Sequence, residues 1–131
     1  MVLVINNACE NNTGNLCPDI TIVPSINPND TGDSYGFSSI ALWGDCLELK
    51  VNYSGGCAQH DFDMRWDGSH AESWPVQVFL SLHHNDNDDP CDGLIFDHLL
   101  LYDLSHLQYE GANSLIINVV GDSKPLLYTY E

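Results

Sequence analysis

Basic residues are scarce in this 131-residue chain, which has only three lysines and arginines against nineteen aspartates and glutamates. The formal net charge at pH 7 is therefore −16. Nucleic acid phosphates and anionic lipid headgroups attract Lys and Arg, so both would repel a surface this acidic. The composition argues against nucleic-acid binding and favours solubility, a saline habitat or cationic partners.

Long apolar runs are also missing, because no stretch reaches the ~20 apolar residues that a membrane-spanning helix needs. The apolar start over residues 1–5 is shorter than the core of a signal peptide and lacks a basic residue before it. Segments rich in Asn, Asp, Gly and Ser with almost no Lys are typical of exported proteins. We therefore expect a secreted or cell-envelope bacterial protein whose leader lies upstream of this sequence, in preference to a cytosolic one.

The sequence also lacks the apolar periodicity of an amphipathic helix. No segment repeats apolar residues every 3.6 positions over a helical length, and only residues 103–109 suggest a helical turn, capped by Asp103 or Ser105. Short runs instead alternate with period two, as in the apolar Leu47, Leu49 and Val51. This alternation predicts strands over residues 37–43, 46–53, 60–66, 76–84, 94–102, 114–120 and 125–130.

Seven or eight short strands with no helices between them predict an all-β domain. The expected architecture is a two-sheet antiparallel β-sandwich with immunoglobulin-like or jelly-roll topology over residues 37–131. Residues 1–36 are rich in Asn, Pro, Asp, Thr and Gly, with strand character only at 20–23, and are predicted to form an irregular arm or tether. Aromatic side chains expected in the core are Trp43, Phe62, Trp66, Trp74, Tyr128 and Tyr130.

Cysteines are few and odd in number, at positions 9, 17, 46, 57 and 91. At least one must be free, bound to metal or paired to another chain, and an exported location makes disulfides the expected use of the others. The sequence leaves the states of Cys9, Cys17 and Cys46 open.

Two cysteines and two histidines are predicted to meet at one end of the sheet. Period two places His60 on the face of Phe62, and His84 on the face of Leu82, so both imidazoles should point inward, where each needs a partner. Two sulfurs and two imidazoles, from Cys57, His60, His84 and Cys91, suit zinc or copper(I). A Cys57–Cys91 disulfide is the favoured alternative, and closing that loop would stabilise the fold by roughly 3–4 kcal/mol.

Two weaker hypotheses concern calcium and catalysis. Calcium ligands could come from the acidic run after the predicted strand 76–84, namely Asp86, Asp88, Asp89 and Asp92, although the run lacks the glycine and glutamate of an EF-hand loop. Catalysis would need Cys57 and His60 to act together, yet residues three apart on a strand point to opposite faces. We therefore expect a solvated loop and no enzymatic activity.

An ordered series of short motifs resembles an uncharacterised family of small bacterial exported or lipoprotein β-domains. The resemblance covers about residues 45–131 and implies a secreted bacterial β-domain without implying an activity. A lipid anchor upstream stays open, because Ala8-Cys9 resembles the end of a lipidation site but Asn6 stands where an aliphatic residue is expected. The motifs are Gly55-Gly56-Cys57-x2-His60-x-Phe62, Trp66-Asp67-Gly68, Glu72-Ser73-x-Pro75-Val76-Gln77, His84, Asp89-x-Cys91, and Phe96-Asp97 followed by Asp103-Leu104.

Two functions of different classes follow from these observations. The favoured one is a disulfide-linked interaction module that displays loops to a protein or glycan partner, with Trp74 and the acidic loop 85–92 as contacts. The alternative is a metal-binding module for zinc or copper.

Overall fold

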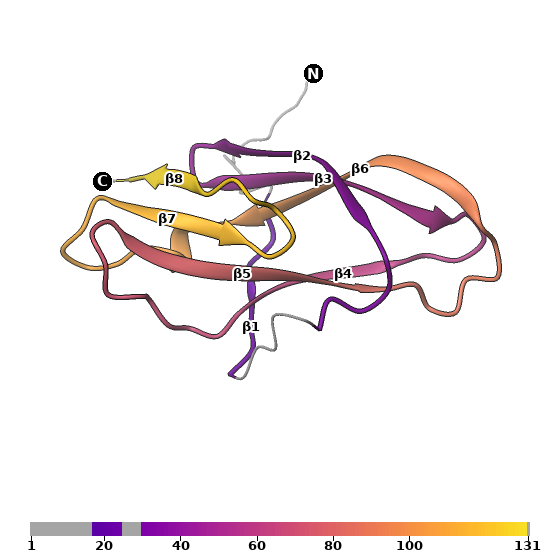
Figure 1. The fold of residues 1–131 in the computed structure, drawn as a ribbon, viewed down its shortest axis with the longest axis horizontal. Helices are drawn as coiled ribbons and strands as arrows, with labels where there is room; N and C mark the ends of the chain where they lie inside the picture. Colours follow the sequence, from indigo (N-terminus) through magenta and orange to yellow (C-terminus); the bar gives the residue numbers. More distant parts are fainter. Residues whose placement is uncertain (1–16, 25–29, 131) are drawn as a thin grey trace, which may run out of the picture.

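The fold consists of two β-sheets in a computed structural model that describes residues 17–24 and 30–130 (Figure 1). The larger sheet has five strands in the order β1-β4-β5-β7-β8, and the smaller has three in the order β2-β3-β6. The strands are β1 (Thr21–Ile22), β2 (Gly36–Trp43), β3 (Cys46–Gly55), β4 (Asp61–Trp66), β5 (Val76–Asn85), β6 (Gly93–Asp103), β7 (Ser114–Val119) and β8 (Leu126–Thr129).

The predicted strands and the all-β class are confirmed, since every run with period two contains a strand. A 3-10 turn over Ser105–Leu107 occupies the predicted helical turn, and the backbone N–H of Ser105 donates to Asp103 Oδ1 at 2.9 Å. Within the described residues, no helix is long and apolar enough to cross a membrane.

The antiparallel prediction holds for the small sheet and is wrong for the large one, which is mixed. β1 runs parallel to β4, and β5 runs parallel to β7. The parallel pairing of β5 with β7 arises because β6, the strand between them in sequence, belongs to the other sheet. After β6, the chain thus re-enters the large sheet as β7, which runs in the same direction as β5. Immunoglobulin-like or jelly-roll connectivity stays a prediction.

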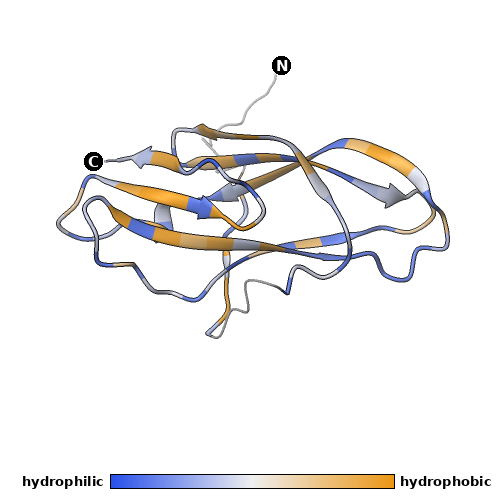
Figure 2. Ribbon diagram, viewed as in Figure 1, coloured by the Kyte–Doolittle hydropathy of each residue, from blue (hydrophilic) through white to orange (hydrophobic). Residues whose placement is uncertain are grey.

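The core lies between the two sheets and follows the period-two pattern. Leu47 and Leu49 of β3 are fully buried, as are Leu80 and Leu82 of β5. Figure 2 shows the corresponding hydrophobic bands along these strands. Of the aromatics assigned to the core, Trp66, Tyr128 and Tyr130 are buried and Phe62 packs against the core.

The assignment of Trp43 and Trp74 to the core is wrong, because both are exposed. Trp43 ends β2 beside the turn to β3, and its indole N–H donates to the Glu48 carboxylate. Trp74 precedes β5 in a loop.

The described part of the N-terminal arm is bound to the domain at several points. A disulfide joins Cys17 to Cys46, with the Cα atoms 6.1 Å apart. The N–H of Asp103 donates to the carbonyl of Pro18 at 2.8 Å, and β1 adds to the edge of the large sheet. Cys9 lies outside the described residues.

Candidate functional site

Strand pairing brings the two histidines together at one end of the molecule. His60 directly precedes β4, and His84 stands near the end of β5, where it is the cross-strand partner of Phe62. The inward orientation expected from the alternation is observed, since His60 is 7% exposed and His84 is 1% exposed.

Cys57 and Cys91 reach the same end in the loops that follow β3 and β5, and they form a disulfide with Cα atoms 5.6 Å apart. The disulfide is the alternative that the sequence favoured over metal binding by the two sulfurs. Sulfurs joined to each other are not thiolates, so the zinc or copper hypothesis would require the bond to be reduced, and it stays a prediction.

Asp89 completes the cluster, and its role was missed in the sequence, where it was grouped with the calcium candidates. Its carboxylate accepts hydrogen bonds from four backbone N–H groups at 2.9–3.3 Å, those of Gly56, Cys57, Ala58 and Cys91. His60 Nε2 lies 2.8 Å from Asp89 Oδ2, and both side chains are 1% exposed. These N–H donors, that of Cys91 foremost, together with His60, hold the pKa of Asp89 well below its usual range.

The other calcium candidates do not gather around Asp89. In the described part of the chain, no three carboxylates of Asp86, Asp88, Asp89 and Asp92 lie within 4.8 Å of one another. Asp86 instead accepts the N–H of Asp88 at 2.9 Å and so orders the turn. The calcium hypothesis stays a prediction without a ready-made cluster.

Hydrogen bonding continues from Asp89 through both histidines, and we call His60, His84 and Asp89 the strand-end network. His60 Nδ1 lies 2.7 Å from His84 Nε2. On its far side, His84 Nδ1 lies 3.2 Å and 3.1 Å from the carbonyl oxygens of Asp33 and Ser34. Carbonyls and carboxylates accept hydrogen bonds, so protons must sit on His84 Nδ1 and on His60 Nε2, with a third between the rings. All four ring nitrogens are therefore engaged in hydrogen bonds in the disulfide-bonded protein.

Aromatic rings surround the strand-end network. Phe62 stacks on His84 with ring centroids 4.4 Å apart, and the ring centroid of Tyr53 lies 4.6 Å from that of His60. A third imidazole, His98, bonds to the Tyr53 hydroxyl. Its burial, and then the charge on His60 and His84, hold the pKa of His98 below its ordinary value.

Gly55 is required beside the network because a side chain there would collide with it. A Cβ at this position would lie 2.6 Å from His60 Nε2 and 2.8 Å from Asp89 Oδ2. We expect Gly55→Ala to lower the free energy of unfolding by about 1–3 kcal/mol, the usual cost of overpacking. Denaturant unfolding monitored by circular dichroism measures this. The matched control is Gly36→Ala, also in a strand, where a Cβ would meet nothing within 4 Å, and an equal loss in both variants would contradict the prediction.

Acid should destabilise the fold in two steps. The folded-state pKa of His98 is lowered from 6.5 and that of Asp89 from 3.8, so each contributes stability at pH values above its unfolded pKa. That stability is lost as the pH falls through the folded pKa. We expect the free energy of unfolding to decline below about pH 6.5 and more steeply below about pH 4.

Unfolding curves at several pH values test this dependence. His98→Gln should flatten the upper step and Asp89→Asn part of the lower one, since Asp33 and Asp67, whose pKa values are also lowered, titrate in the same acidic range. A stability that stays constant between pH 7 and pH 4 in the unmodified protein would contradict the two-step prediction.

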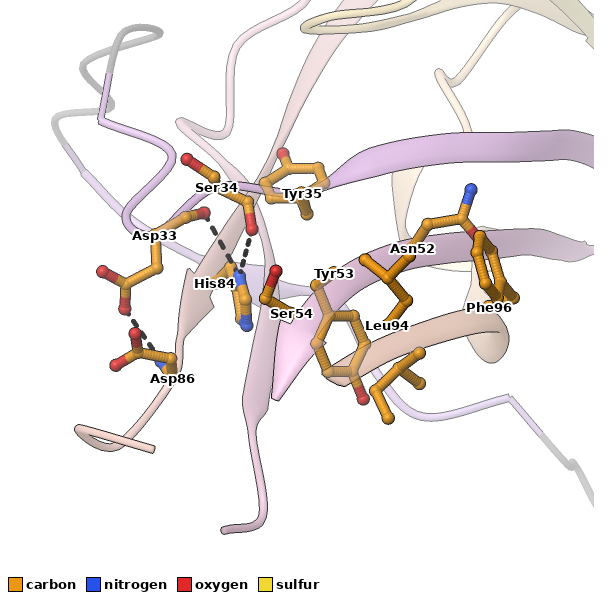
Figure 3. Close-up of a pocket in the computed structure, with 11 residues that line it drawn as sticks. Asp33, Ser34, Tyr35, Asn52, Tyr53, Ser54, His84, Asp86, Leu94 and Phe96 are labelled. Carbon is orange, nitrogen blue, oxygen red and sulfur yellow. Dashed lines mark hydrogen bonds between the residues drawn. The ribbon is translucent and has the colours of Figure 1, made fainter. Parts of the chain in front are cut away.

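An open hollow of about 470 Å³ adjoins the network. We call it the β3–β6 hollow. Leu94 and Phe96 of β6 form an apolar wall and are 70% and 65% exposed, while Asp33 and Asp86 supply carboxylates (Figure 3). The N–H of Asp86 donates to Asp33 Oδ2 at 2.8 Å and holds the pKa of Asp33 below its usual value. The residues that line the hollow are Asp33, Ser34, Tyr35, Asn52, Tyr53, Ser54, His84, Asp86, Leu94, Ile95 and Phe96.

Sequence patterns alone did not point to this hollow, because its walls come from separate segments of the chain. The contacts proposed from the sequence are not brought together either. Trp74 precedes β5 and the acidic loop 85–92 follows it, so a ten-residue strand, about 33 Å long, separates them.

Comparison with known proteins identifies a similar fold but no family. No family model matches the sequence, and no curated protein matches it. A NigD-like immunity protein from Bacteroides caccae has a TM-score of 0.58 at 18% sequence identity, over 87% of this chain and 59% of that one. A protein of unknown function, DUF1344, from Bacteroides vulgatus has a TM-score of 0.55 at 14% identity, over 89% and 59%.

The chain therefore spans about three fifths of either Bacteroides protein, and at these identities the similarity establishes the fold alone. The resemblance to a family of bacterial exported domains is thus supported at the level of fold, and membership of that family stays a prediction. The two disulfides favour an oxidising, extracytoplasmic compartment.

Proposed function

We propose that this protein is a secreted or cell-envelope interaction module that binds a basic segment of a protein partner in the β3–β6 hollow. One observation carries the proposal: the exposed apolar pair Leu94 and Phe96 lines one side of the hollow, and the carboxylates of Asp33 and Asp86 line the other (Figure 3). An exposed apolar wall and negative charges within one hollow form a binding site for a side chain that has an apolar stem and a cationic end.

Lys and Arg side chains have this character. The methylene stem of one such side chain would pack on Leu94, and its charged group would lie near Asp33 and Asp86. The Phe96 ring, on the other side of the hollow, would make a cation–π contact with a further Lys or Arg of the same segment. No lysine or arginine is among the described lining residues. The net charge of −16 would also accelerate encounter with a basic partner and disfavour self-association.

The neighbouring edge of β6 extends this surface. Over the described residues, its outer edge pairs with no strand of the sheet. Only its last residue, Asp103, forms an isolated parallel bridge with Asp19 and donates its N–H to the Pro18 carbonyl. Leu99, also exposed, continues the apolar row that is visible as a hydrophobic band along the arch of β6 (Figure 2). Unpaired edges accept an extended segment of a partner as an additional strand. We propose that the basic segment binds in this extended form.

Binding without catalysis fits the chemistry of the strand end, where both ring nitrogens of His60 and of His84 are already hydrogen-bonded. One protein of similar fold is described as an immunity protein, and we propose for this chain too a role exercised by binding. A glycan partner has less support, because exposed Trp74 precedes β5 and so lies at the other end of this strand from the acidic loop.

The test is titration of the isotope-labelled protein with a synthetic peptide of alternating valine and lysine. We expect chemical shift changes at residues 33–35, 52–54 and 94–96, and a binding constant that weakens as salt is added. Phe96→Ala should weaken binding at least tenfold, about 1.4 kcal/mol, because it removes the apolar and cation–π wall.

The matched control is Phe79→Ala, since Phe79 is also exposed but lies on the outer face of the large sheet. It should bind the peptide as the unmodified protein does. Equal binding of a peptide with glutamate in place of lysine, or undiminished binding by Phe96→Ala, would contradict the proposal.

A further inference from the structure

We propose that reduction of the Cys57–Cys91 disulfide converts the strand end into a zinc site, with Cys57, His60, Asp89 and Cys91 as its ligands. This activity is separate from partner binding in the β3–β6 hollow and does not depend on it. The set differs from the one expected from the sequence by one residue, because Asp89 takes the place of His84.

Three of the four ligand groups already lie close together, and the fourth, His60, contacts one of them. The sulfurs of Cys57 and Cys91 and a carboxylate oxygen of Asp89 are all within 4.8 Å of one another, and His60 Nε2 is 2.8 Å from Asp89 Oδ2. Zinc bonds of about 2.0–2.3 Å place neighbouring ligand atoms of a tetrahedron roughly 3.3–3.8 Å apart. Shifts of about an ångström would therefore bring the two sulfurs and the Asp89 carboxylate to a common ion, next to His60 Nε2.

Geometry explains why His60 is the ligand and His84 supports it. His60 Nε2 lies 2.8 Å from Asp89 Oδ2, whereas His84 Nε2 lies 2.7 Å from His60 Nδ1. With zinc at His60 Nε2, His60 Nδ1–H would donate to His84 Nε2, while His84 Nδ1–H keeps its bonds to the carbonyls of Asp33 and Ser34. A ligating histidine commonly makes such a bond through its other nitrogen, which fixes the ring orientation.

The chemistry balances with a dithiol as the reductant. The dithiol supplies two electrons and two protons, the Cys57–Cys91 bond breaks to give two thiols, and the dithiol becomes a disulfide. Zinc then binds two thiolates, the Asp89 carboxylate and neutral His60, releasing two protons from the thiols and one from His60 Nε2. Cys57 is exposed, so a reductant can reach the bond.

The experiment uses the full chain with all its cysteines. One portion is reduced with a phosphine, which binds zinc weakly, another stays oxidised, and zinc chloride is added to each under argon. Alkylation of each cysteine is followed over time by mass spectrometry. We expect one zinc ion per reduced chain and at least tenfold slower alkylation of Cys57 and Cys91, with no protection of Cys17 and Cys46.

Variants of the reduced protein test the ligand assignment. Asp89→Asn and His60→Gln should weaken zinc binding at least tenfold, whereas neighbouring Asp88→Asn and His83→Gln should leave it unchanged. Cobalt(II) in place of zinc should give the visible bands of a tetrahedral thiolate site.

Four results would overturn the proposal: alkylation unaffected by zinc, protection of Cys17 and Cys46 instead, equal zinc uptake by the oxidised protein, or a reduced chain that unfolds and takes up no zinc. None of these bears on peptide binding at the hollow, which is measured on the oxidised protein.

Discussion

His60→Ala should lower the free energy of unfolding by about 3–5 kcal/mol, a large share of the roughly 5–15 kcal/mol typical of a domain. His60 joins the Asp89 carboxylate to His84, and its side chain is 1% exposed. Its removal leaves the buried Asp89 carboxylate without one hydrogen-bond partner and one His84 nitrogen without its partner. Denaturant unfolding at pH 7, monitored by circular dichroism, measures the loss.

The control for this prediction is His106→Ala. His106 is exposed and contacts Asp19 at the surface, so its removal should change the free energy of unfolding by less than about 0.5 kcal/mol. A loss below about 1 kcal/mol in His60→Ala would mean that the strand-end network contributes little to folding, and would contradict the prediction.

Replacing Cys57 and Cys91 together by serine should lower the free energy of unfolding by roughly 3–4 kcal/mol from loop entropy alone. We expect the measured loss to be larger, because the same two loops supply the backbone N–H donors that hold Asp89. Thermal and denaturant unfolding of the variant quantify the loss.

The second disulfide provides a matched comparison. Cys17 and Cys46 are 29 residues apart, close to the 34 of Cys57 and Cys91, so the loop entropies of the two bonds are nearly equal. The serine variant of Cys17 and Cys46 should therefore show the loop entropy with no contribution from Asp89. Equal losses in the two double variants would contradict the additional role assigned to the Cys57–Cys91 loops.

Strand positions were predictable because local patterns determine them. Leu47, Leu49 and Val51 must share one face of a strand, and burying that face requires a second sheet. The same alternation turned His60 and His84 inward and placed them near each other. The all-β class, the strand boundaries and the cluster of Cys57, His60, His84 and Cys91 at one end therefore followed from the sequence.

Other features depended on contacts between distant segments. The parallel pairing of β5 with β7 depends on which sheet receives β6, and period two does not determine that choice. Asp89 looked like one of several loop carboxylates because its distinguishing partners are backbone N–H groups from another loop. Trp43 was assigned to the core from its size, whereas its place beside a turn leaves it exposed.

The central claim is that His60, His84 and Asp89 form one buried network with three shared protons. Long-range proton–nitrogen NMR of the histidine rings in the oxidised protein at pH 7 tests it most directly. We predict three slowly exchanging N–H protons over the two rings, identified by contacts to Tyr53 and Phe62, with one lying between His60 Nδ1 and His84 Nε2. Two such protons, with no coupling between the rings, would contradict the claim.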